Sequence, residues 1–391
     1  MKIALFTDTY FPEINGVATS CKSLRDILVK HGHEVLVITT NPFSNKLIVE
    51  KDIIRISGVT LKRMYNYRLA SIFNRKAMKA IRRFDPDLCH IQTEASIGIF
   101  GRIAARNLQI PVVYTYHTMY EDYTYYVTKG HFDRFAKGLM RTFFRGVINN
   151  SDEFITPSSK TKDYMRQIGV DVFANVIPTG VDFEKFYPSN IKKGIKEELR
   201  EKFGINSETF TLLSLGRIAK EKSIDFSIKC FATFLKDYPS INAKMVIVGK
   251  GPGEDELKAL VKELDIADKV VFTGPCSPDE VQNYYQLGDA FVSASLSETQ
   301  GLTYMEAMAA HLYVMARYDH NLLDVIQDGV SGYFFENENE FSKKLYQVYE
   351  LFINKDDEML NNAIKGIDQY SIETFYNKII KAYKHVLKSR W

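Results

Sequence analysis

Two successive series of apolar runs, separated by amphipathic stretches, constrain the fold of this chain more than any other feature. Short apolar runs predict buried strands, and apolar residues at helical spacing predict the helices between them. A strand, a helix and a second strand in close succession form a parallel βαβ unit. In the first series the expected strands are residues 2–6, 34–39, 87–91, 111–116 and 153–156, and the expected helices are residues 17–30 and 96–107.

The second series follows residues 178–188, a polar segment with a proline at each end that is expected to connect two domains. Two domains also follow from the length, because 391 residues exceed what one hydrophobic core usually organises. The expected strands of this series are residues 211–215, 244–248, 270–273, 290–293, 313–316 and 332–335, and the expected helices are residues 224–235, 254–264, 281–287, 371–388 and one that starts near Gly301.

The alternation predicts an α/β protein of two doubly wound domains. We expect a ligand to bind at the carboxyl ends of the strands, in a cleft across which the two sheets face each other. The predicted boundaries are residues 1–185 for the first domain and 186–370 for the second. Residues 371–391 are expected to form a terminal helix that packs back on the first domain.

The composition narrows the class of protein. Hydrophobic residues make up 45% of the chain and charged residues 25%, as in soluble globular proteins. The four cysteines lack paired spacing, which favours thiols in a reducing compartment over a disulfide or zinc framework. No signal-peptide pattern follows Met1, and no apolar run approaches the ~20 residues of a membrane helix. We therefore expect a cytoplasmic protein.

Charge is unevenly spread along the chain. Residues 1–188 carry 26 Lys and Arg against 18 Asp and Glu, whereas the remainder carries 25 against 30. Residues 62–83 contain eight basic and no acidic residues among apolar and aromatic ones, and a second basic and aromatic segment spans residues 129–145. These segments can lie on an anionic membrane surface or form solvated helix faces. No nucleic-acid-binding module accompanies them, so we expect no nucleic-acid partner.

The loop that follows the strand at residues 290–293 carries the most informative motif, with Glu298 before a helix start and Glu306 inside the helix. Unpaired N–H groups and the helix dipole at such a start suit a diphosphate or a developing anion. Gly301 has no Cβ and is expected to let a ligand approach the backbone. The two carboxylates can accept hydrogen bonds from sugar and ribose hydroxyls. The alternative is a capping box formed by Ser295 and Glu298.

Two further loops of the second domain carry candidate phosphate ligands. Arg217 and Lys222 leave the carboxyl end of a predicted strand, and two cations suit a diphosphate. Residues 248–255 (VGKGPGED) suggest a dinucleotide-binding turn. That fingerprint also requires an acidic residue near the end of the next strand, which here ends at Thr273. The nicotinamide interpretation therefore lacks its ribose ligand.

The first domain offers weaker candidates. His117 follows a predicted strand and can donate a hydrogen bond to a ligand, although a lone histidine is often structural. Glu121 and Asp122 could act as a base, bind an acceptor hydroxyl or be surface charges. Gly16 could let a phosphate or an acceptor approach a helix start, or be a turn glycine. Residues 85–87 (DPD) resemble a metal-binding acid pair but precede a strand, so we interpret them as a turn and expect no required metal.

Together with Arg217, Lys222, His117 and the glutamate pair, several segments resemble the retaining glycosyltransferases of family 4, which have the GT-B architecture. FTDTYFPEINGVATS resembles the N-terminal glycine loop of that family, and IPTGVDFEKFYP resembles its linker. GRIAKEKS and SETQGLTYMEAMA resemble its donor motifs, so the likeness spans nearly the whole chain. HTMYEDYTYY, the basic surface and SETQGLTY look most like bacterial diacylglycerol glucosyltransferases.

By position, the resemblance implies that Arg217 and Lys222 bind the donor diphosphate and that Glu306 binds the ribose. It implies that His117 lies under the sugar near the reaction centre and that Gly16 lines the diphosphate and acceptor side. The implied catalytic residues are His117, Glu298, Arg217 and Lys222. The implied contacts to the transferred sugar come from Glu298 and the backbone of Thr299, Gln300, Gly301, Leu302 and Thr303.

The resemblance also implies a chemistry. Family 4 enzymes retain the anomeric configuration by front-face attack, with the leaving diphosphate accepting the proton of the acceptor, so no protein nucleophile, metal or other cofactor is required. Cations and a helix dipole around a leaving group that gains charge fit this reaction in a cleft that excludes water. The first domain would bind the acceptor, with its basic surface toward the membrane, and the second would bind the nucleotide-sugar donor.

Three departures from the family pattern stand out. His311 replaces the usual glycine in residues 310–313 (AHLY) and puts a bulky ring close to the entry of the next strand, so the family's loop geometry cannot be assumed there. Residues 318–321 (YDHN) replace a glycine pair, so sugar or acceptor selection there cannot be carried over. Thr179 stands where Asn is common, which we expect to be harmless.

The expected function is transfer of an α-glucosyl group from UDP-glucose to diacylglycerol, by an enzyme peripheral on the inner face of the cell membrane. The alternatives are the same chemistry with another donor sugar, or with another acceptor such as a glycosylated lipid, a cell-wall precursor or a polysaccharide. A non-catalytic nucleotide-sugar-binding protein is the third possibility, and the intact donor motifs argue against it.

Overall fold

The computed structural model describes residues 1–13, 15–61, 67–117, 138, 142–143, 145–167, 173–295, 298 and 300–389. The chain forms two compact units. Unit 1 comprises Met1–Gly180 and Ile372–Trp391, and unit 2 comprises Val181–Ser371. Within the described part of the chain, no helix combines the length and the apolar character needed to cross a membrane.

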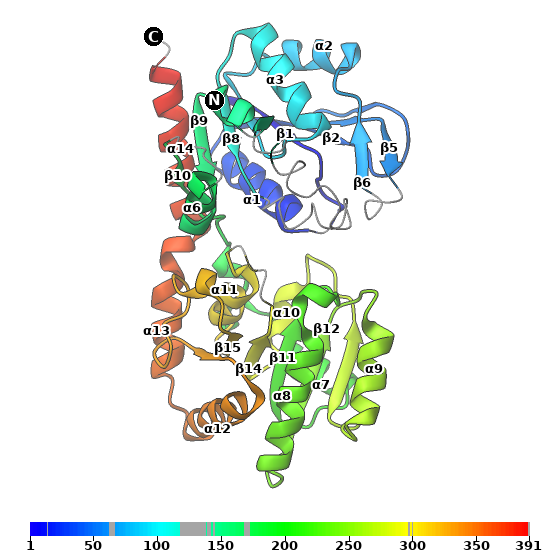
Figure 1. The fold of residues 1–391 in the computed structure, drawn as a ribbon, viewed down its shortest axis with the longest axis vertical. Coiled ribbons are helices and arrows are strands. Elements are labelled where there is room, and N and C mark those ends of the chain that lie inside the picture. The colour runs from blue at the N-terminus through cyan, green and yellow to red at the C-terminus, as the bar shows by residue number, and fades with distance from the viewer. Residues whose placement is uncertain are drawn as a thin grey trace. The chain divides into compact units, whose positions relative to one another are not determined.

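Unit 1 is built on a mostly parallel sheet with the strand order β10-β9-β8-β7-β1-β2-β4-β3, in which only the short β3 pairs antiparallel among the described strands (Figure 1). The order reverses between β1 and β7, which is the doubly wound arrangement. A separate hairpin joins β5 and β6. The strands are β1 Lys2–Thr7, β2 Glu34–Thr40, β3 Ile48–Val49, β4 Ile53–Ile56, β5 Gly58–Leu61, β6 Tyr67–Ala70, β7 Leu88–Ile91, β8 Val112–Thr115, β9 Glu153–Thr156 and β10 Asn175–Val176.

Helices cover both faces of this sheet because successive residues of a strand point to opposite sides. On β1, Ala4 and Phe6 pack in a core with α2 and α3, where the rings of Phe6 and Phe100 meet edge to face at 6.0 Å. Ile3 and Leu5 pack in a second core with α1 and the terminal helix α14, which is red in Figure 1. The helices are α1 Gly16–Lys30, α2 Arg75–Phe84, α3 Ser96–Leu108, α6 Ser159–Gln167 and α14 Ile372–Lys388.

A buried carboxylate fixes the carboxyl edge of the sheet where the strand order reverses. Asp8 follows β1 and accepts hydrogen bonds from the hydroxyls of Thr93 and Ser96, each at 2.6 Å, and from the N–H of Ile97 at 3.0 Å. It therefore satisfies the start of α3, whose own cap residue Ala95 makes no side-chain bond. Burial raises the pKa of Asp8, while these hydrogen bonds act in the opposite direction.

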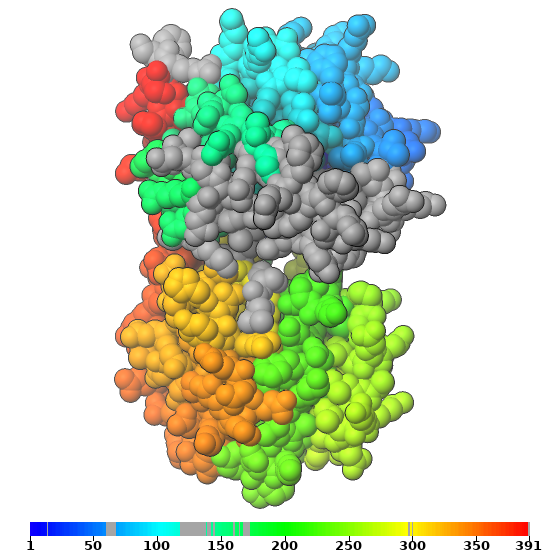
Figure 2. Space-filling view, viewed as in Figure 1, coloured from blue at the N-terminus to red at the C-terminus, as the bar shows by residue number. Residues whose placement is uncertain are grey.

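Unit 2 repeats the doubly wound arrangement with the parallel strand order β13-β12-β11-β14-β15-β16. Its helix α12 packs on α8, and their orange and green surfaces adjoin in Figure 2. The strands are β11 Phe210–Leu215, β12 Ala243–Val248, β13 Val270–Gly274, β14 Ala290–Ser293, β15 Tyr313–Arg317 and β16 Tyr333–Phe335. The helices are α7 Ile195–Lys202, α8 Ile224–Asp237, α9 Glu254–Glu263, α10 Val281–Tyr285, α11 Leu302–Ala309, α12 Glu338–Asn354 and α13 Glu358–Ile367.

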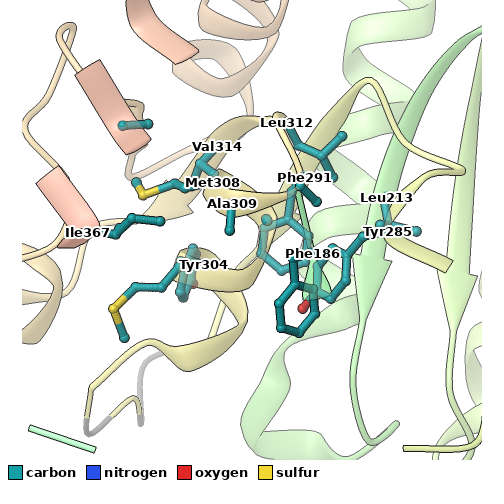
Figure 3. Close-up of a cluster of buried hydrophobic side chains, with 14 of the residues drawn as sticks. Phe186, Leu213, Tyr285, Phe291, Tyr304, Met308, Ala309, Leu312, Val314 and Ile367 are labelled. Atoms are coloured by element: carbon teal, nitrogen blue, oxygen red, sulfur yellow. The ribbon is translucent and has the colours of Figure 1, made fainter. Parts of the chain in front are cut away.

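An aromatic cluster packs α10 and α11 on one face of this second sheet (Figure 3). The rings of Phe186 and Tyr285 meet edge to face at 5.5 Å, and those of Phe291 and Tyr304 at 5.6 Å. Both tyrosines are fully buried at their rings. A buried hydroxyl needs a hydrogen-bond partner. The hydroxyl of Tyr285 finds its partners in α11, and that of Tyr304 finds its partner at the end of β14.

The predicted doubly wound architecture is confirmed, and each predicted strand and helix is present with ends that differ by at most two residues. The prediction omitted the short strands β3 to β6 and β10 and the helices α2, α6, α7, α12 and α13. The chain passes between the two units at residues 180–181 and 371–372.

Candidate active site

Glycines in the turn after β12 let two loops of unit 2 pack together. A Cβ on Gly249 would lie 1.9 Å from the carbonyl oxygen of Gly216, and one on Gly251 would lie 1.9 Å from that of Ile218. The N–H of Ile218 also donates to the carbonyl of Lys250 at 3.1 Å. Glycine is therefore needed at these two positions for packing, because it lets the turn contact the loop after β11 that carries Arg217 and Lys222.

In the loop after β11, the two predicted phosphate ligands, Arg217 and Lys222, have different partners. The ammonium group of Lys222 lies 2.7 Å from the carboxylate of Glu298, whose side chain is only 11% exposed. Arg217 instead pairs with Glu221 on the surface, and its side chain is 64% exposed. The structure thus brings Lys222 and Glu298 into direct contact and pairs Arg217 with Glu221 instead.

A second loop holds Glu298 from its other side. The amide nitrogen of Asn321 donates to the backbone carbonyl of Glu298 at 2.6 Å. Asp319 in turn accepts from the N–H of Asn321 at 2.9 Å and so shapes the short turn after β15. Within the part of the chain that the structure describes, one buried oxygen on each of Asp319, Asn321 and Ser295 has no hydrogen-bond partner. These three oxygens belong to the Glu298 loop and to the turn after β15 and are able to accept further hydrogen bonds.

The capping box considered for Ser295 and Glu298 is not formed. Helix α11 begins at Leu302, its cap residue is Gly301, and no side chain caps it. Gly301 adopts a left-handed φ of 71°, and a Cβ there would lie 2.5 Å from Leu322. Backbone conformation and packing therefore require glycine here, and the approach of a ligand to this backbone stays a prediction.

Glu306 is held by the aromatic cluster beneath the helix. The hydroxyl of Tyr285 donates to Glu306 at 2.7 Å and lies 3.3 Å from the carbonyl of Thr303. Burial raises the pKa of Glu306, while Tyr285 and the charge of Lys185 act in the opposite direction. Burial and the carboxylates of Glu306 and Glu298 raise the pKa of Tyr285 well above its usual value. The two glutamates therefore act on the same tyrosine.

The remaining predicted residues of this loop are less constrained. Gln300 is buried, and Leu302 and Thr303 are half-buried at the first turn of α11. Thr299 lies outside the described residues. The hydroxyl of Tyr304 donates to the carbonyl of Ser293 at 3.1 Å, which ties the helix to the end of β14.

In unit 1, His117 follows β8, as predicted. Its Nε2 lies 2.5 Å from the side-chain oxygen of Gln92, and burial lowers its pKa to about 4. Gly16 is the first residue of α1, whose N-terminus is capped by the side chain of Asn15, and a Cβ on Gly16 would meet nothing within 4 Å. Glu121 and Asp122 lie outside the described residues.

The acid pair at residues 85–87 lies at the other edge of the sheet. Asp85 ends α2 in the left-handed conformation, and Asp87 accepts from the backbone N–H of Lys2 at 2.7 Å. The interpretation as a turn between helix and strand is confirmed. Among the described residues, no cluster of three or more His, Cys, Asp and Glu side chains could hold a metal ion.

Comparison with known proteins places both units in one family. Residues 14–185 match the family described as Glycosyltransferase Family 4, and residues 195–366 match Glycosyl transferases group 1. The chain is 37% identical over 383 residues to the alpha-monoglucosyldiacylglycerol synthase of Streptococcus pneumoniae, which covers 98% of this chain and 85% of that protein. It is 37% identical over 355 residues to the Acholeplasma laidlawii protein of the same name, with 89% and 88% covered. This chain belongs to glycosyltransferase family 4.

Solved structures identify the fold as GT-B. The structure of Anabaena Alr3699/HepE in complex with UDP-glucose matches with a TM-score of 0.72 at 16% identity, covering 98% of this chain and all of that one. Sucrose-phosphate synthase from Thermosynechococcus elongatus matches with a TM-score of 0.75 at 18% identity, covering 99% of each chain. Its membership in family 4 makes the protein a retaining glycosyltransferase, of a family that uses nucleotide-sugar donors, as the sequence motifs predicted.

One departure from the family 4 pattern proves compatible with its loop. His311 takes a left-handed φ of 64° directly after α11. Its N–H donates to the carbonyl of Met308 at 3.1 Å, and that of Leu312 donates to Ala307 at 3.0 Å. These two bonds form a Schellman motif, which usually has glycine at the His311 position. The loop therefore accommodates His311 with these hydrogen bonds formed, although a residue with a Cβ carries a conformational cost in the left-handed conformation.

The sequence interpretation of this glycosyltransferase missed Asn321, Gln92 and Tyr285. Asn321 stood inside the departure at residues 318–321, where it signalled only a difference from the family. Gln92 follows β7 at the same sheet edge as His117, and that position could have identified it. Tyr285 gave no signal, because a buried tyrosine and a tyrosine that binds a carboxylate look the same in a sequence.

Proposed function

We propose that this family 4 enzyme transfers an α-glucosyl group from UDP-glucose to 1,2-diacylglycerol at the inner face of the cell membrane. The observation that carries the proposal is the 37% identity, over nearly the whole chain, to a protein named alpha-monoglucosyldiacylglycerol synthase. The second protein of that name, from a different organism, has the same identity.

The donor side of the proposed reaction rests on Lys222 and Arg217. An ammonium group has three N–H donors, so Lys222 can keep its contact with Glu298 while it binds a phosphate oxygen. The exposed pair of Arg217 with Glu221 contributes about 0–1 kcal/mol to stability, so Arg217 can exchange that partner for a diphosphate at little cost. Both cations would stabilise negative charge on the leaving group.

Glu298 and Glu306 are proposed to bind the sugar and the ribose. A carboxylate can accept several hydrogen bonds, so Glu306 can accept from a ribose hydroxyl while Tyr285 donates to it. Glu298 is fixed by Lys222 and Asn321 from two sides, which presets its orientation toward the transferred sugar. The leaving diphosphate would take the proton of the acceptor hydroxyl, and no protein side chain is asked to be the nucleophile.

The acceptor side is proposed to use the basic surface of unit 1. Helix α2 buries Ala77, Met78 and Ile81 and exposes all five of its basic residues. Just before it, Ile72 and Phe73 are 52% and 41% exposed. A basic helix face beside exposed apolar side chains fits an anionic membrane surface, where each charge contributes about 1 kcal/mol. Residues 62–66 and most of 129–145 lie outside the described residues.

The experiment that tests the function measures label from a panel of nucleotide sugars in a chloroform-extractable product, with diacylglycerol in anionic micelles. We expect label in the lipid from UDP-glucose alone. Hydrolysis of the nucleotide sugar without a lipid product would point to another acceptor, such as a glycosylated lipid or a soluble glycan. Absence of turnover with every donor would favour a non-catalytic binding protein.

The donor site is tested by Glu298→Ala and Lys222→Ala, which should each lower turnover at least 100-fold, the loss expected from removing a group that stabilises transition-state charge. Thermal unfolding should change little, because the pair lies in a loop. The matched control is Lys258→Ala, which breaks a pair with Glu254 of similar length, 2.6 Å, on the exposed side of α9. Normal activity in either site variant would remove that residue from the proposed site.

A further inference from the structure

We propose that a chain of buried hydrogen bonds, from Tyr383 on the terminal helix α14 through His90 and Gln92, fixes the tautomer of His117. The proton is held on Nε2 of His117, and the bare Nδ1 is presented to a substrate hydroxyl. Gln92, His90 and Tyr383 are thus positioning residues. The kinetic part of this inference rests on the proposed function and on the place beside the reacting sugar that the family resemblance implies for His117.

The chain of contacts is continuous. The hydroxyl of Tyr383 lies 2.6 Å from Nδ1 of His90. The amide nitrogen of Gln92 lies 2.8 Å from Nε2 of the same ring, and the amide oxygen of Gln92 lies 2.5 Å from Nε2 of His117. Four side chains from two strand ends, the loop after β7 and α14 are therefore linked without a gap.

The position of each proton follows from what each atom can do. An amide oxygen only accepts, so Nε2 of His117 must carry the proton that Gln92 receives. An amide nitrogen only donates, so Nε2 of His90 must be bare, and the hydroxyl of Thr115, 2.8 Å away, can donate to that same nitrogen. His90 then carries its proton on Nδ1 and donates to Tyr383.

Burial keeps both rings neutral, which this scheme requires. His90 and Tyr383 are fully buried, and Gln92 and Thr115 are 2% and 6% exposed. Burial and, to a smaller extent, the neighbouring His117 lower the pKa of His90 to about 3. A charged imidazole would be a donor at both nitrogens, whereas a neutral one keeps one acceptor.

The inference specifies what His117 can do for the reaction. With Nε2 committed to Gln92, the ring can accept a hydrogen bond at Nδ1 and has no proton to donate there. It would orient a hydroxyl of the donor sugar or of the acceptor and would not supply a proton to the leaving group. The inference differs from the sequence-based expectation, in which His117 donates a hydrogen bond to the ligand. The second-layer partner of a histidine sets its tautomer in the same way at other functional sites.

The first test is spectroscopic and does not depend on turnover. Long-range ¹H–¹⁵N correlation spectra of the full-length protein distinguish a protonated ring nitrogen from a bare one. We expect His117 to be protonated on Nε2 and His90 on Nδ1. A proton on Nδ1 of His117, which the reverse orientation of the Gln92 amide would produce, overturns the inference even if glucosyl transfer is established.

The second test compares two tyrosines on the same helix. Tyr383→Phe removes the far end of the chain and should turn the His117 signals into a mixture of tautomers and lower kcat about fivefold, as expected for one lost hydrogen bond. The matched control is Tyr376→Phe. The hydroxyl of Tyr376 lies 3.1 Å from Nε2 of His33 and takes no part in the hydrogen bonds between Tyr383 and His117. That variant should leave the His117 spectrum and kcat unchanged. An unchanged His117 spectrum in Tyr383→Phe would contradict the proposal that this chain of hydrogen bonds fixes the tautomer of His117.

A third variant covers the case in which Tyr383→Phe does not fold. Gln92→Glu keeps the side-chain shape but places a carboxylate beside both imidazoles, which favours their charged forms. The pKa of His117, followed by its ring signals, should rise by at least one unit. An unchanged value would show that Gln92 does not act on His117. Loss of lipid labelling in the wild-type protein would defeat the proposed function but leave these spectroscopic results standing.

Discussion

Individual residues in the left-handed conformation mark both ends of α11, the helix behind the glutamate loop. Gly301 precedes the helix with a φ of 71°, and its missing Cβ makes room for Leu322. His311 follows it with a φ of 64° and keeps the hydrogen bonds of a Schellman motif. The left-handed conformation costs conformational free energy at His311 but not at Gly301, because glycine adopts it freely and a residue with a Cβ does not.

His311→Gly should therefore stabilise unit 2. We expect the free energy of unfolding to rise by about 0.5–1 kcal/mol, because the gain from relieving the left-handed Cβ exceeds the added freedom of the unfolded chain. Urea denaturation followed by circular dichroism measures the change. His311→Ala is the control and should bring no gain, since alanine has the same Cβ. Equal stability of all three proteins would mean that the conformation carries no cost.

At the scale of elements, two loops at the carboxyl edge of the second sheet preset Glu298. The turn after β11 supplies Lys222, and the turn after β15 supplies Asn321, which binds the backbone carbonyl of Glu298 at 2.6 Å. The glycine pair that the family usually has at this second turn has no side chain that could make such a bond. In this protein the residues that replace the glycine pair, 318–321, thus provide an additional hydrogen bond that holds the Glu298 loop.

Asn321→Ala should weaken donor use without unfolding the protein. Loss of a buried hydrogen bond of about 1–3 kcal/mol frees the Glu298 loop, so kcat/KM for the nucleotide sugar should fall roughly 5- to 100-fold. Steady-state kinetics with varied donor measures this effect. The control is Asn242→Ala, which removes an amide bond to Thr209 at 3.1 Å near the start of β11, at the opposite edge of the sheet. Similar kinetics in both variants would argue against a specific role of Asn321.

At the scale of the whole molecule, unit 1 depends on the last helix of the chain. Helix α14 buries Phe375, Ile379, Tyr383 and Val386 in the core that it shares with α1. Each fully buried large side chain contributes about 1.5–3 kcal/mol, so their sum is comparable to the net stability of a domain, about 5–15 kcal/mol. The segment that ends the chain therefore completes the unit that begins it.

A chain that ends at residue 371 should lose the fold of unit 1 and keep that of unit 2. Limited proteolysis with mass spectrometry should then recover a resistant fragment close to Val181–Ser371. The control is a chain that ends after Lys388, the last residue of α14, and it should resist proteolysis throughout both units. Survival of unit 1 fragments without α14 would contradict the prediction.

Acid should destabilise unit 1 through its buried imidazoles. The pKa values of His90 and His117 lie near 3 and 4, below the ordinary 6.5, so between pH 6.5 and 4 the unfolded chain binds more protons than the folded one. Stability therefore falls as the pH falls, by about 1.4 kcal/mol per pH unit for each histidine. His90→Gln should reduce the slope of the free energy of unfolding against pH by the contribution of one histidine, about 1.4 kcal/mol per pH unit. Urea titrations at pH 7, 6 and 5 measure this slope. Parallel curves for the two proteins would exclude His90 as a cause.

The sequence by itself determined the two doubly wound sheets and the family. Buried parallel strands read as continuous apolar runs, and the donor motifs are contiguous segments whose residues need no distant partner to be recognised. It also indicated Lys222, Glu298, Glu306 and His117, because parallel strands deliver their carboxyl ends to one edge of a sheet.

Tertiary structure alone decided which of these residues meet. Lys222 contacts Glu298 across 76 positions of sequence, while Arg217 pairs with its neighbour Glu221. The bonds that hold the site, from Asn321 to Glu298 and from Tyr383 to His90, join segments whose approach depends on the packing of whole helices and loops. Local spacing carries no record of such contacts, since a buried side chain finds its partner only after the core around it has formed.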